Sequence, residues 1–255
     1  MVISGRRLEG KVAVVTGGGG GIGSAVGQTF SEKRAKVALV DRDPELLQEA
    51  IDEIKGHNPQ TQVASFVVNP GEESEAARVV KETGKTFEGI DVLVNNVGIR
   101  SYIPIDGTPW DKWHDIINVN MRFVSMTRAC WPTLRKSGRG SIVNISSMNG
   151  VYGGRGMGAY DSMKSAVLTF SRTLAHEEHE HNVRVNSFCP GFTRTKFQLK
   201  RLGQDTVDDY VPSCNIRRWA DPVELVYPIL WLASEEASYV TVGTFMIDGG
   251  YGHVE

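Results

Sequence analysis

A tyrosine and a lysine in the second half of the chain have the types and the spacing to move a proton. Tyr160 precedes Lys164 by four residues, so on a helix the phenol and the ammonium lie on one face. A free tyrosine loses its proton at about pH 10, but a neighbouring cation favours the phenolate. The pair predicts a general acid–base in which Lys164 lowers the pKa of Tyr160. Taken alone, such pairs also pack on helix surfaces.

A serine precedes this pair at a position from which it can reach the same substrate. Ser147 lies 13 residues before Tyr160, directly after the segment SIVNIS. Its hydroxyl can hydrogen-bond the oxygen of an alcohol or a carbonyl. The alternative is an ordinary turn or helix-cap serine.

A run of glycines follows the first apolar segment and precedes a helical pattern. Residues 16–23 read TGGGGGIG, directly after KVAVV. Glycines let the backbone approach a ligand closely, and amide groups at the start of a helix bind a pyrophosphate. A glycine-rich turn alone is a weak signal. The strand before it and the helix after it supply the context of a dinucleotide-binding turn.

An aspartate at the end of the next apolar segment predicts which dinucleotide binds. Asp41 lies 18 residues after Gly23, close to the spacing of about 20 residues expected for the acid that binds the adenosine ribose. Its carboxylate accepts hydrogen bonds from the ribose hydroxyls and repels a 2′-phosphate, which favours NAD over NADP. Two alternatives stay open: Arg42 attracts that phosphate, or Asp41 is only a strand-end turn residue.

Seven short runs rich in β-branched residues alternate with longer helical patterns. The strand candidates are KVAVVTG, KVALVD, VASFVV, DVLVNN, SIVNIS, VRVNSF and TFMID. The helical candidates cover residues 44–55, 72–87, 110–136 and 160–179. Apolar runs without strict alternation indicate strands covered on both faces, and βαβ repetition requires parallel strands. We therefore expect a single α/β domain over residues 1–255, a doubly wound, seven-stranded parallel sheet flanked by helices.

Segment 192–217 is the least regular part of the chain. It holds few apolar periodicities, so it is a candidate substrate lid. An ordinary surface excursion is the equal alternative.

Composition excludes several classes of partner. The 255 residues include 28 basic and 30 acidic side chains, a formal charge of −2, so neither nucleic acid nor an anionic membrane is an expected partner. No apolar run near the N-terminus is long enough for a signal peptide, and we expect a cytoplasmic location. The three cysteines form no C-x-x-C pair, and the histidines of 176–181 do not match H-E-x-x-H, so we expect no metal site.

Taken together, these residues resemble the short, single-domain branch of the short-chain dehydrogenase/reductase family. TGGGGGIG is similar to the family's cofactor turn, NNVG at 95–98 to its N-N-A-G segment, and Ser147, Tyr160 and Lys164 to its catalytic residues. The resemblance covers nearly the whole chain. It implies a Rossmann-like fold, a homotetramer and a proton relay supported by Asn120. It assigns the cofactor to a larger set of residues: Gly17, Gly21, Ile22, Gly23, Asp41, Asn69, Asn96, Gly98, Tyr160, Lys164, Pro190, Gly191, Thr193 and Thr195.

Two positions depart from the family pattern. Where the family often has an aspartate beside the adenine, this chain reads Val68-Asn69-Pro70, so Asn69 is expected to replace that contact in part through its amide. Val97 replaces the alanine of N-N-A-G, which adds two methyl groups near the cofactor.

Three arginines lie on loops next to these motifs, and they bear on the substrate. Arg100 follows NNVG, Arg155 precedes Tyr160, and Arg194 lies in PGFTRT. Arginine binds carboxylates and phosphates through paired donors, so an anionic substrate is one hypothesis, with Met148 as an apolar pocket wall. Arg155 is the first candidate, because it lies five residues before Tyr160, and Arg194 in the candidate lid is the second. The alternative is three solvated loop arginines.

These features predict an NAD-dependent oxidoreductase that interconverts a secondary alcohol and a ketone. Tyr160 exchanges the proton, Lys164 lowers its pKa and binds ribose, Ser147 orients the oxygen and Asn120 maintains the relay. The family's epimerases and dehydratases are one alternative, although 255 residues leave little room for their extra substrate domain. A cofactor-binding protein without activity is the other, but binding alone does not require Tyr160 and Lys164.

Overall fold

The computed structural model describes residues 5–252, and its seven strands form one parallel sheet. The strands are β1 (Val12–Thr16), β2 (Lys36–Asp41), β3 (Val63–Val67), β4 (Val92–Asn95), β5 (Ser141–Ile145), β6 (Arg184–Pro190) and β7 (Thr244–Ile247). Their order in the sheet is β3-β2-β1-β4-β5-β6-β7, and all neighbours are parallel. The predicted seven-stranded parallel sheet is confirmed.

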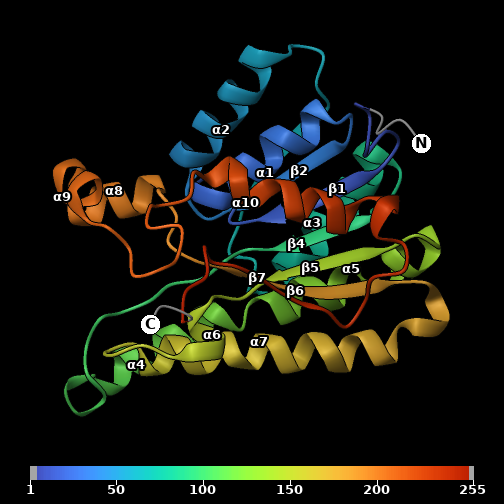
Figure 1. The fold of residues 1–255 in the computed structure, drawn as a ribbon. Coiled ribbons are helices and arrows are strands. Elements are labelled where there is room, and N and C mark those ends of the chain that lie inside the picture. Colours follow the sequence, from blue (N-terminus) through green and yellow to red (C-terminus); the bar gives the residue numbers. More distant parts are fainter. Residues whose placement is uncertain (1–4, 253–255) are drawn as a thin grey trace.

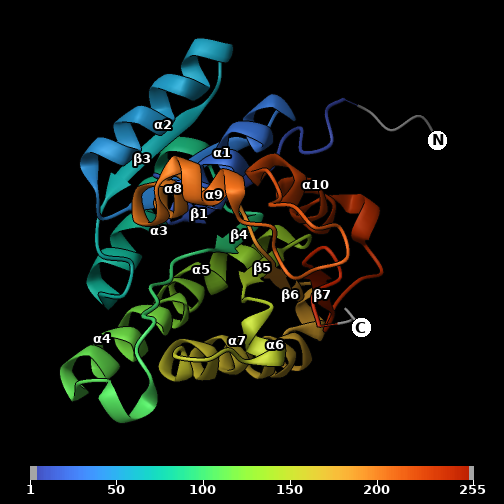
Figure 2. The same cartoon turned by 60° about the vertical axis from the view of Figure 1, so that its left-hand side comes forward.

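Helices cover both faces of the sheet (Figures 1 and 2). The α-helices are α1 (Gly21–Glu32), α2 (Pro44–His57), α3 (Glu73–Phe87), α4 (Trp110–Asn120), α5 (Phe123–Ser137), α6 (Asn149–Tyr152), α7 (Gly158–Glu177), α8 (Lys196–Leu202), α9 (Gln204–Asp209) and α10 (Pro222–Ala233). Short 3₁₀ helices are η1 (Ile105–Gly107), η2 (His179–His181) and η3 (Glu235–Ala237).

Two apolar clusters hold the layers together. On one face α1, α2 and α10 pack on the sheet through residues such as Phe30, Leu47 and Leu230. On the other face α3, α5 and α7 do so through Val79, Met126 and Leu174. The central strands are buried on both faces, which explains why their sequences lack polar alternation. None of the helices in residues 5–252 is both long and apolar enough to cross a membrane.

The helix predicted over residues 110–136 is two helices, so that prediction was wrong. The break falls at Met121 and Arg122, between α4 and α5. The side-chain amide of Asn120 donates to the carbonyl oxygens of Ile116 and Ile99, each over 2.8 Å. One of these bonds is to the preceding turn of its own helix and the other to the loop after β4. The side chain therefore competes with the continuing helix for its carbonyl groups.

Segment 192–217 also differs from the sequence expectation, because it contains two short helices. Thr195 caps the first of them, α8, by accepting a hydrogen bond from the Gln198 amide over 3.3 Å. Gly203 lies between the two helices with a φ of +83°, a backbone conformation that few other residues adopt. Figure 1 shows α8 and α9 standing off the carboxyl ends of the strands, apart from the main layers.

The strand order places the predicted motifs at one edge. The chain reverses its winding direction between β1 and β4, and ligands of open α/β sheets bind beyond the carboxyl ends of the strands at such a point. The glycine turn follows β1, Asp41 ends β2 and Ser147 follows β5. All of them therefore meet at this edge.

Candidate active site

The glycine turn after β1 is closed by direct backbone contacts. A Cβ atom at Gly23 would lie 2.0 Å from the carbonyl oxygen of Gly17, so no side chain fits there. Gly17 has a φ of +65°, and its carbonyl accepts a hydrogen bond from the Asn96 side-chain amide over 3.3 Å. Ile22 packs against the apolar core. Gly20 precedes α1 and has no side chain to cap the first amides, which leaves this helix end suited to bind a pyrophosphate.

Asp41 is fixed against this turn by three backbone amides. Its Oδ2 accepts from the Gly19 amide over 3.1 Å, and its Oδ1 accepts from Arg42 and Asp43 over 2.7 and 3.2 Å. These bonds hold the carboxylate in one orientation at the end of β2. The carboxylate predicted to face the adenosine ribose thus lies beside the phosphate-binding turn.

The residues beyond β3 lie next to Asp41. Val68 donates its amide to the Asp41 carbonyl oxygen over 2.8 Å, which brings the Val68-Asn69-Pro70 departure to the predicted adenosine site. The Asn69 side chain is occupied in its own turn, since Oδ1 accepts from the Gly71 amide over 3.1 Å and Nδ2 donates to Glu72 over 3.4 Å. An adenine contact by Asn69 stays a prediction, because it would compete with these bonds.

Sequence reasoning missed a second arginine beside Arg42. The positive charge of Arg42, together with burial, lowers the pKa of Arg122, with burial the larger cause. A Cβ at Gly71 would lie 2.3 Å from the Arg122 side chain, so a glycine there leaves room for that arginine. Arg122 lies in no recognised motif, and only the fold brings it to this site.

The loop after β6 meets the glycine turn and the C-terminal D-G-G segment. Thr195 comes within 3.3 Å of the position that a Cβ at Gly21 would take. A Cβ at Gly191 would lie 2.5 Å from the Asp248 Cα atom. Pro190 ends β6, and Thr193 is buried with its hydroxyl donating to the Gly191 carbonyl over 3.0 Å. The structure therefore brings the loop after β6, whose residues are predicted to bind the cofactor, against the glycine turn.

Asn120, Gly98 and Lys164 converge beneath this loop. A Cβ at Gly98 would lie 2.8 Å from Asn120 Oδ1 and 3.0 Å from Lys164 Nζ. Asn120 Oδ1 is buried, and no atom of residues 5–252 forms a hydrogen bond with it. A buried acceptor of this kind needs a donor, so the site suits a bound water or a ligand hydroxyl there. Lys164 Nζ donates to the carbonyl oxygen of Ile145 over 2.9 Å.

Tyr160 and Ser147 are the other two of the four residues predicted to handle the proton. The two hydroxyl groups are hydrogen-bonded, and the Lys164 ammonium lies 5.8 Å from the centre of the Tyr160 ring. Ser147 Oγ also accepts the Asn149 amide over 3.2 Å, which fixes the serine at the start of the turn after β5. The four residues proposed for proton handling therefore lie together. They present hydroxyl and ammonium groups at the carboxyl edge of the sheet.

A second cation acts on Tyr160 besides the lysine that the sequence pointed to. Burial raises the pKa of Tyr160 above its usual value, and the positive charge of Arg100 and the hydrogen bond with Ser147 act in the opposite direction. The pKa of Lys164 is lowered to about 8, chiefly by burial, with Cys189 acting to raise it and Arg100 to lower it. Arg100 therefore favours the ionised phenol and the neutral amine at once.

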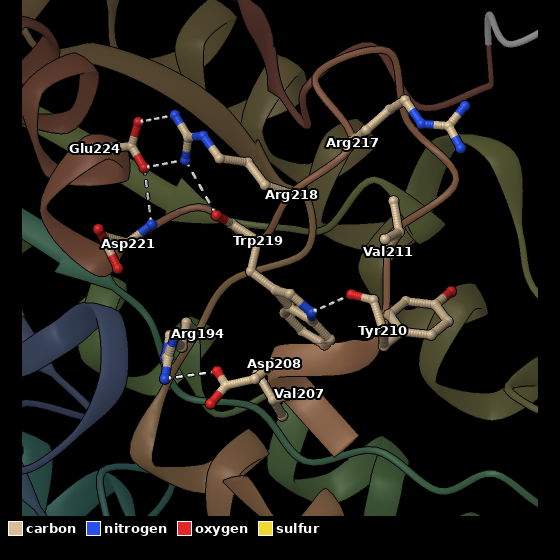
Figure 3. Close-up of a pocket in the computed structure, with 10 residues that line it drawn as sticks. All are labelled: Arg194, Val207, Asp208, Tyr210, Val211, Arg217, Arg218, Trp219, Asp221 and Glu224. Atoms are coloured by element: carbon tan, nitrogen blue, oxygen red, sulfur yellow. Dashed lines mark hydrogen bonds and ion pairs between the residues drawn. The ribbon is translucent and has the colours of Figure 1, made fainter. Parts of the chain in front are cut away.

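The other two predicted substrate arginines are placed differently. Arg194 forms an ion pair with Asp208 over 2.8 Å, in a pocket of about 470 Å³ between α9 and α10 (Figure 3). Neither Tyr160 nor Ser147 lines that pocket. Arg155 is exposed on the turn before α7. Met148 is buried, and its amide donates to the Pro190 carbonyl over 3.0 Å.

Arg201, on α8, is a further residue near the site that the sequence did not indicate. Its guanidinium carbon lies 4.2 Å from the centre of the Tyr102 ring, and that of Arg100 lies 5.6 Å from the same ring. Arg201 follows Phe197 by four residues on one helix face. That spacing is the only sequence signal that could have found it, because the contact with Tyr102 depends on the fold.

Comparison with known proteins supports one family. A family model described as short chain dehydrogenase matches residues 11–205. The chain is 36% identical to 3-oxoacyl-(acyl-carrier-protein) reductase FabG of Thermotoga maritima, over 96% of this chain and 98% of that protein. It is 31% identical to an NADP-dependent (R)-specific alcohol dehydrogenase of Lentilactobacillus kefiri, over 96% of this chain and 98% of that protein.

The fold agrees with a solved member of similar size. The crystal structure of levodione reductase superposes with a TM-score of 0.90 at 25% identity, covering 95% of this chain and 98% of that one. The residues that the family model matches include the glycine turn, Ser147, Tyr160 and Lys164. This chain belongs to the short chain dehydrogenase family and is an oxidoreductase of that family.

Proposed function

We propose that the protein interconverts a secondary alcohol and a ketone with a nicotinamide dinucleotide, preferring NAD. The supporting observation is the contact set at the carboxyl edge: Tyr160 bonded to Ser147, and Lys164 close to both Tyr160 and Asn120. The residues fit the cofactor, because the Gly17 and Gly23 positions leave a cradle that any Cβ would fill. When bound, the nicotinamide supplies the carbon that accepts or donates hydride.

Each proton-handling residue has a distinct task in this proposal. Tyr160 takes the hydroxyl proton during oxidation and returns it during reduction, while Ser147 positions the substrate oxygen. Lys164, held by the Ile145 carbonyl, binds the ribose and delivers protons toward the tyrosine. The free Oδ1 of Asn120 supports a water that connects Lys164 to solvent.

The preference for NAD rests on the fixed carboxylate of Asp41. Its bonds to Gly19 and Arg42 orient it toward the ribose position, where it would repel a 2′-phosphate. Arg42 and Arg122 act in favour of NADP, since paired guanidinium groups attract a 2′-phosphate. One relative is named NADP-dependent. We give Asp41 more weight because it is the group fixed against the phosphate turn.

The surroundings of the site lead to two further proposals. We infer that segment 192–217 is a substrate lid within one domain, because Thr195 and Phe197 connect it to the glycine turn and to Arg100. We also infer a homotetramer in the cytoplasm. The two long helices α5 and α7 offer faces for subunit contact, and Cys130, Cys189 and Cys214 are all unpaired. Sedimentation at micromolar concentration would show a tetramer if this is right and a monomer if it is wrong, and cell fractionation tests the location.

The experiment for the proposed function is a substrate screen. Alcohols, diols, sugars and hydroxy acids, and the matching ketones, are offered with NAD or NADP in either redox state while the absorbance of the reduced cofactor is followed. Cofactor-coupled turnover of at least one secondary alcohol or ketone is expected. Binding of NAD without turnover of any compound in the screen would instead favour a cofactor-binding protein.

A further inference from the structure

Two guanidinium groups meet at the ring of Tyr102. Arg100 lies on the loop after β4, and its guanidinium carbon is 5.6 Å from the Tyr102 ring centre and 5.5 Å from that of Phe197. Arg201 lies on α8 and is 4.2 Å from the Tyr102 ring centre. The lid helix and the β4 loop are therefore joined through stacked arginines and aromatic rings. Because both cations contact one ring, they are close enough to repel each other.

Neither cation is neutralised by a carboxylate. Among residues 5–252, ion pairs form at Arg194, with Asp208, and at Arg218, with Glu224, but not at Arg100 or Arg201. Arg201 donates only to the neutral Gln198 amide oxygen, over 3.1 Å. The two arginines of the Tyr102 cluster differ in this from Arg194, the arginine of segment 192–217 that has a carboxylate partner.

The acid closest to Tyr160 in sequence is occupied elsewhere. Asp161 accepts from the Asn149 side chain over 3.2 Å and from the Gly154 amide over 2.7 Å. Asp161 is buried in the first turn of α7, and these bonds hold it against α6 and the turn that precedes α7. Asp161 is near enough to Tyr160 to raise its pKa, but it forms no ion pair with Arg100 or Arg201 in the described part of the chain.

The cluster adjoins the reacting group. The charge of Arg100 reaches both Tyr160 and Lys164, and Tyr102 is also close enough to Tyr160 to affect it. The turn before α7 packs on the same loop, since a Cβ at Gly156 would lie 3.4 Å from the Tyr102 backbone. A molecule with its reacting oxygen at Tyr160 thus lies beside Arg100, which has no ion-pair partner among residues 5–252.

We infer that Arg100 and Arg201 together bind the carboxylate of the substrate, which is a secondary hydroxy acid or the corresponding oxo acid. This inference rests on the proposed function for the reacting carbon. Guanidinium groups present paired donors that match the two oxygens of a carboxylate, and the aromatic stack restricts their motion. One arginine comes from the lid and the other from the core loop. The bound anion therefore bridges them and holds the lid against the sheet edge.

The first test measures binding without turnover. Protein saturated with oxidised cofactor is titrated in a calorimeter with a series of short alkanoates and with the corresponding uncharged amides. The best alkanoate should bind at least about tenfold more tightly than its amide, as expected for a charge-assisted pair. Arg100→Met and Arg201→Met should each remove most of this preference and leave the affinity for the amide unchanged. Arg172→Met, an exposed arginine on α7, is the matched control and should retain the preference.

The second test uses the same pairs as substrates. The Michaelis constant for a hydroxy acid should rise about tenfold or more in Arg201→Met, with little change for the hydroxy amide. Arg201 is the cleaner variant, because Arg100 also acts on Tyr160. Equal binding of alkanoate and amide by the parent protein, or a preference that survives in both variants, would overturn the inference. Discrimination in the calorimeter without turnover of any alcohol or ketone would contradict the proposed function and leave the carboxylate site supported.

Discussion

The Lys164 ammonium donates a hydrogen bond of 2.9 Å to the carbonyl oxygen of Ile145, the last residue of β5. This bond fixes the cation at the carboxyl edge of the sheet, 5.8 Å from the centre of the Tyr160 ring. Lys164 is 4% exposed, and burial lowers its pKa from 10.5 to about 8. The protein therefore keeps a charged amine at the site at a cost in stability.

Replacing this lysine should raise stability and remove activity. The lowered pKa means that keeping Lys164 protonated at neutral pH destabilises the folded parent by about 3 kcal/mol. The substitution removes this destabilisation but also removes the hydrogen bond to Ile145, which stabilises the parent by about 1 kcal/mol. Lys164→Met should therefore unfold a few degrees higher than the parent, bind cofactor more weakly and lose turnover. Calorimetry and cofactor titration measure these effects. A variant less stable than the parent at pH 7 would show that the lysine contributes to folding.

The same lowered pKa of Lys164 makes the free energy of unfolding depend on pH. The folded protein releases the Lys164 proton at about pH 8, whereas the unfolded chain holds it until about pH 10.5. Across this window the unfolded chain binds more protons, so the contribution of Lys164 to stability rises with pH. The difference in stability between Lys164→Met and the parent should therefore decrease from about pH 8 to about pH 10.5. Unfolding of both proteins at several pH values measures this difference directly.

Much of this arrangement could be predicted because the motif residues end strands. Asp41 closes β2 and Asn95 closes β4, so a parallel sheet brings the residues that follow to one edge. The break between α4 and α5 could not be predicted, because Met121 and Arg122 are good helix formers. It depends on the contact of Asn120 with the Ile99 carbonyl, which exists only in the folded chain.

The arginines show the same limit. From the sequence alone Arg155 ranks first among the three predicted substrate arginines, because it lies five residues before Tyr160, and Arg194 ranks second. Only the fold pairs Arg194 with Asp208 and leaves Arg100 beside Tyr160 without a carboxylate partner in residues 5–252. Arg201 reaches this cluster through the packing of α8 against Tyr102.

Asp41 should determine the choice of cofactor. The parent should use NAD at least about tenfold better than NADP in kcat/KM, because the fixed carboxylate repels a 2′-phosphate. Asp41→Ala should narrow this ratio, chiefly by improved use of NADP, and Arg42→Ala should widen it. Dissociation constants of both reduced cofactors, measured by fluorescence, check the binding part. Equal use of the two cofactors by the parent would mean that Arg42 and Arg122 dominate.

The Arg194–Asp208 ion pair should affect lid position and not substrate charge. Both side chains are more than a third exposed, so the pair contributes at most about 1 kcal/mol. Arg194→Met, Asp208→Asn and the double variant should therefore raise KM by a similar, small factor for charged and uncharged substrates alike. A loss confined to acidic substrates in Arg194→Met would instead assign substrate binding to Arg194.

The central claim is that the Tyr160 hydroxyl moves the substrate proton, and Tyr160→Phe tests it most directly. The substitution keeps the ring beside Lys164 and removes only the hydroxyl that bonds Ser147. Single-turnover formation of reduced cofactor should slow by about a thousandfold, the scale of general acid–base catalysis. The dissociation constant of the cofactor should change by less than about threefold, since no ribose contact of Lys164 is removed. A rate within tenfold of the parent would contradict the assignment.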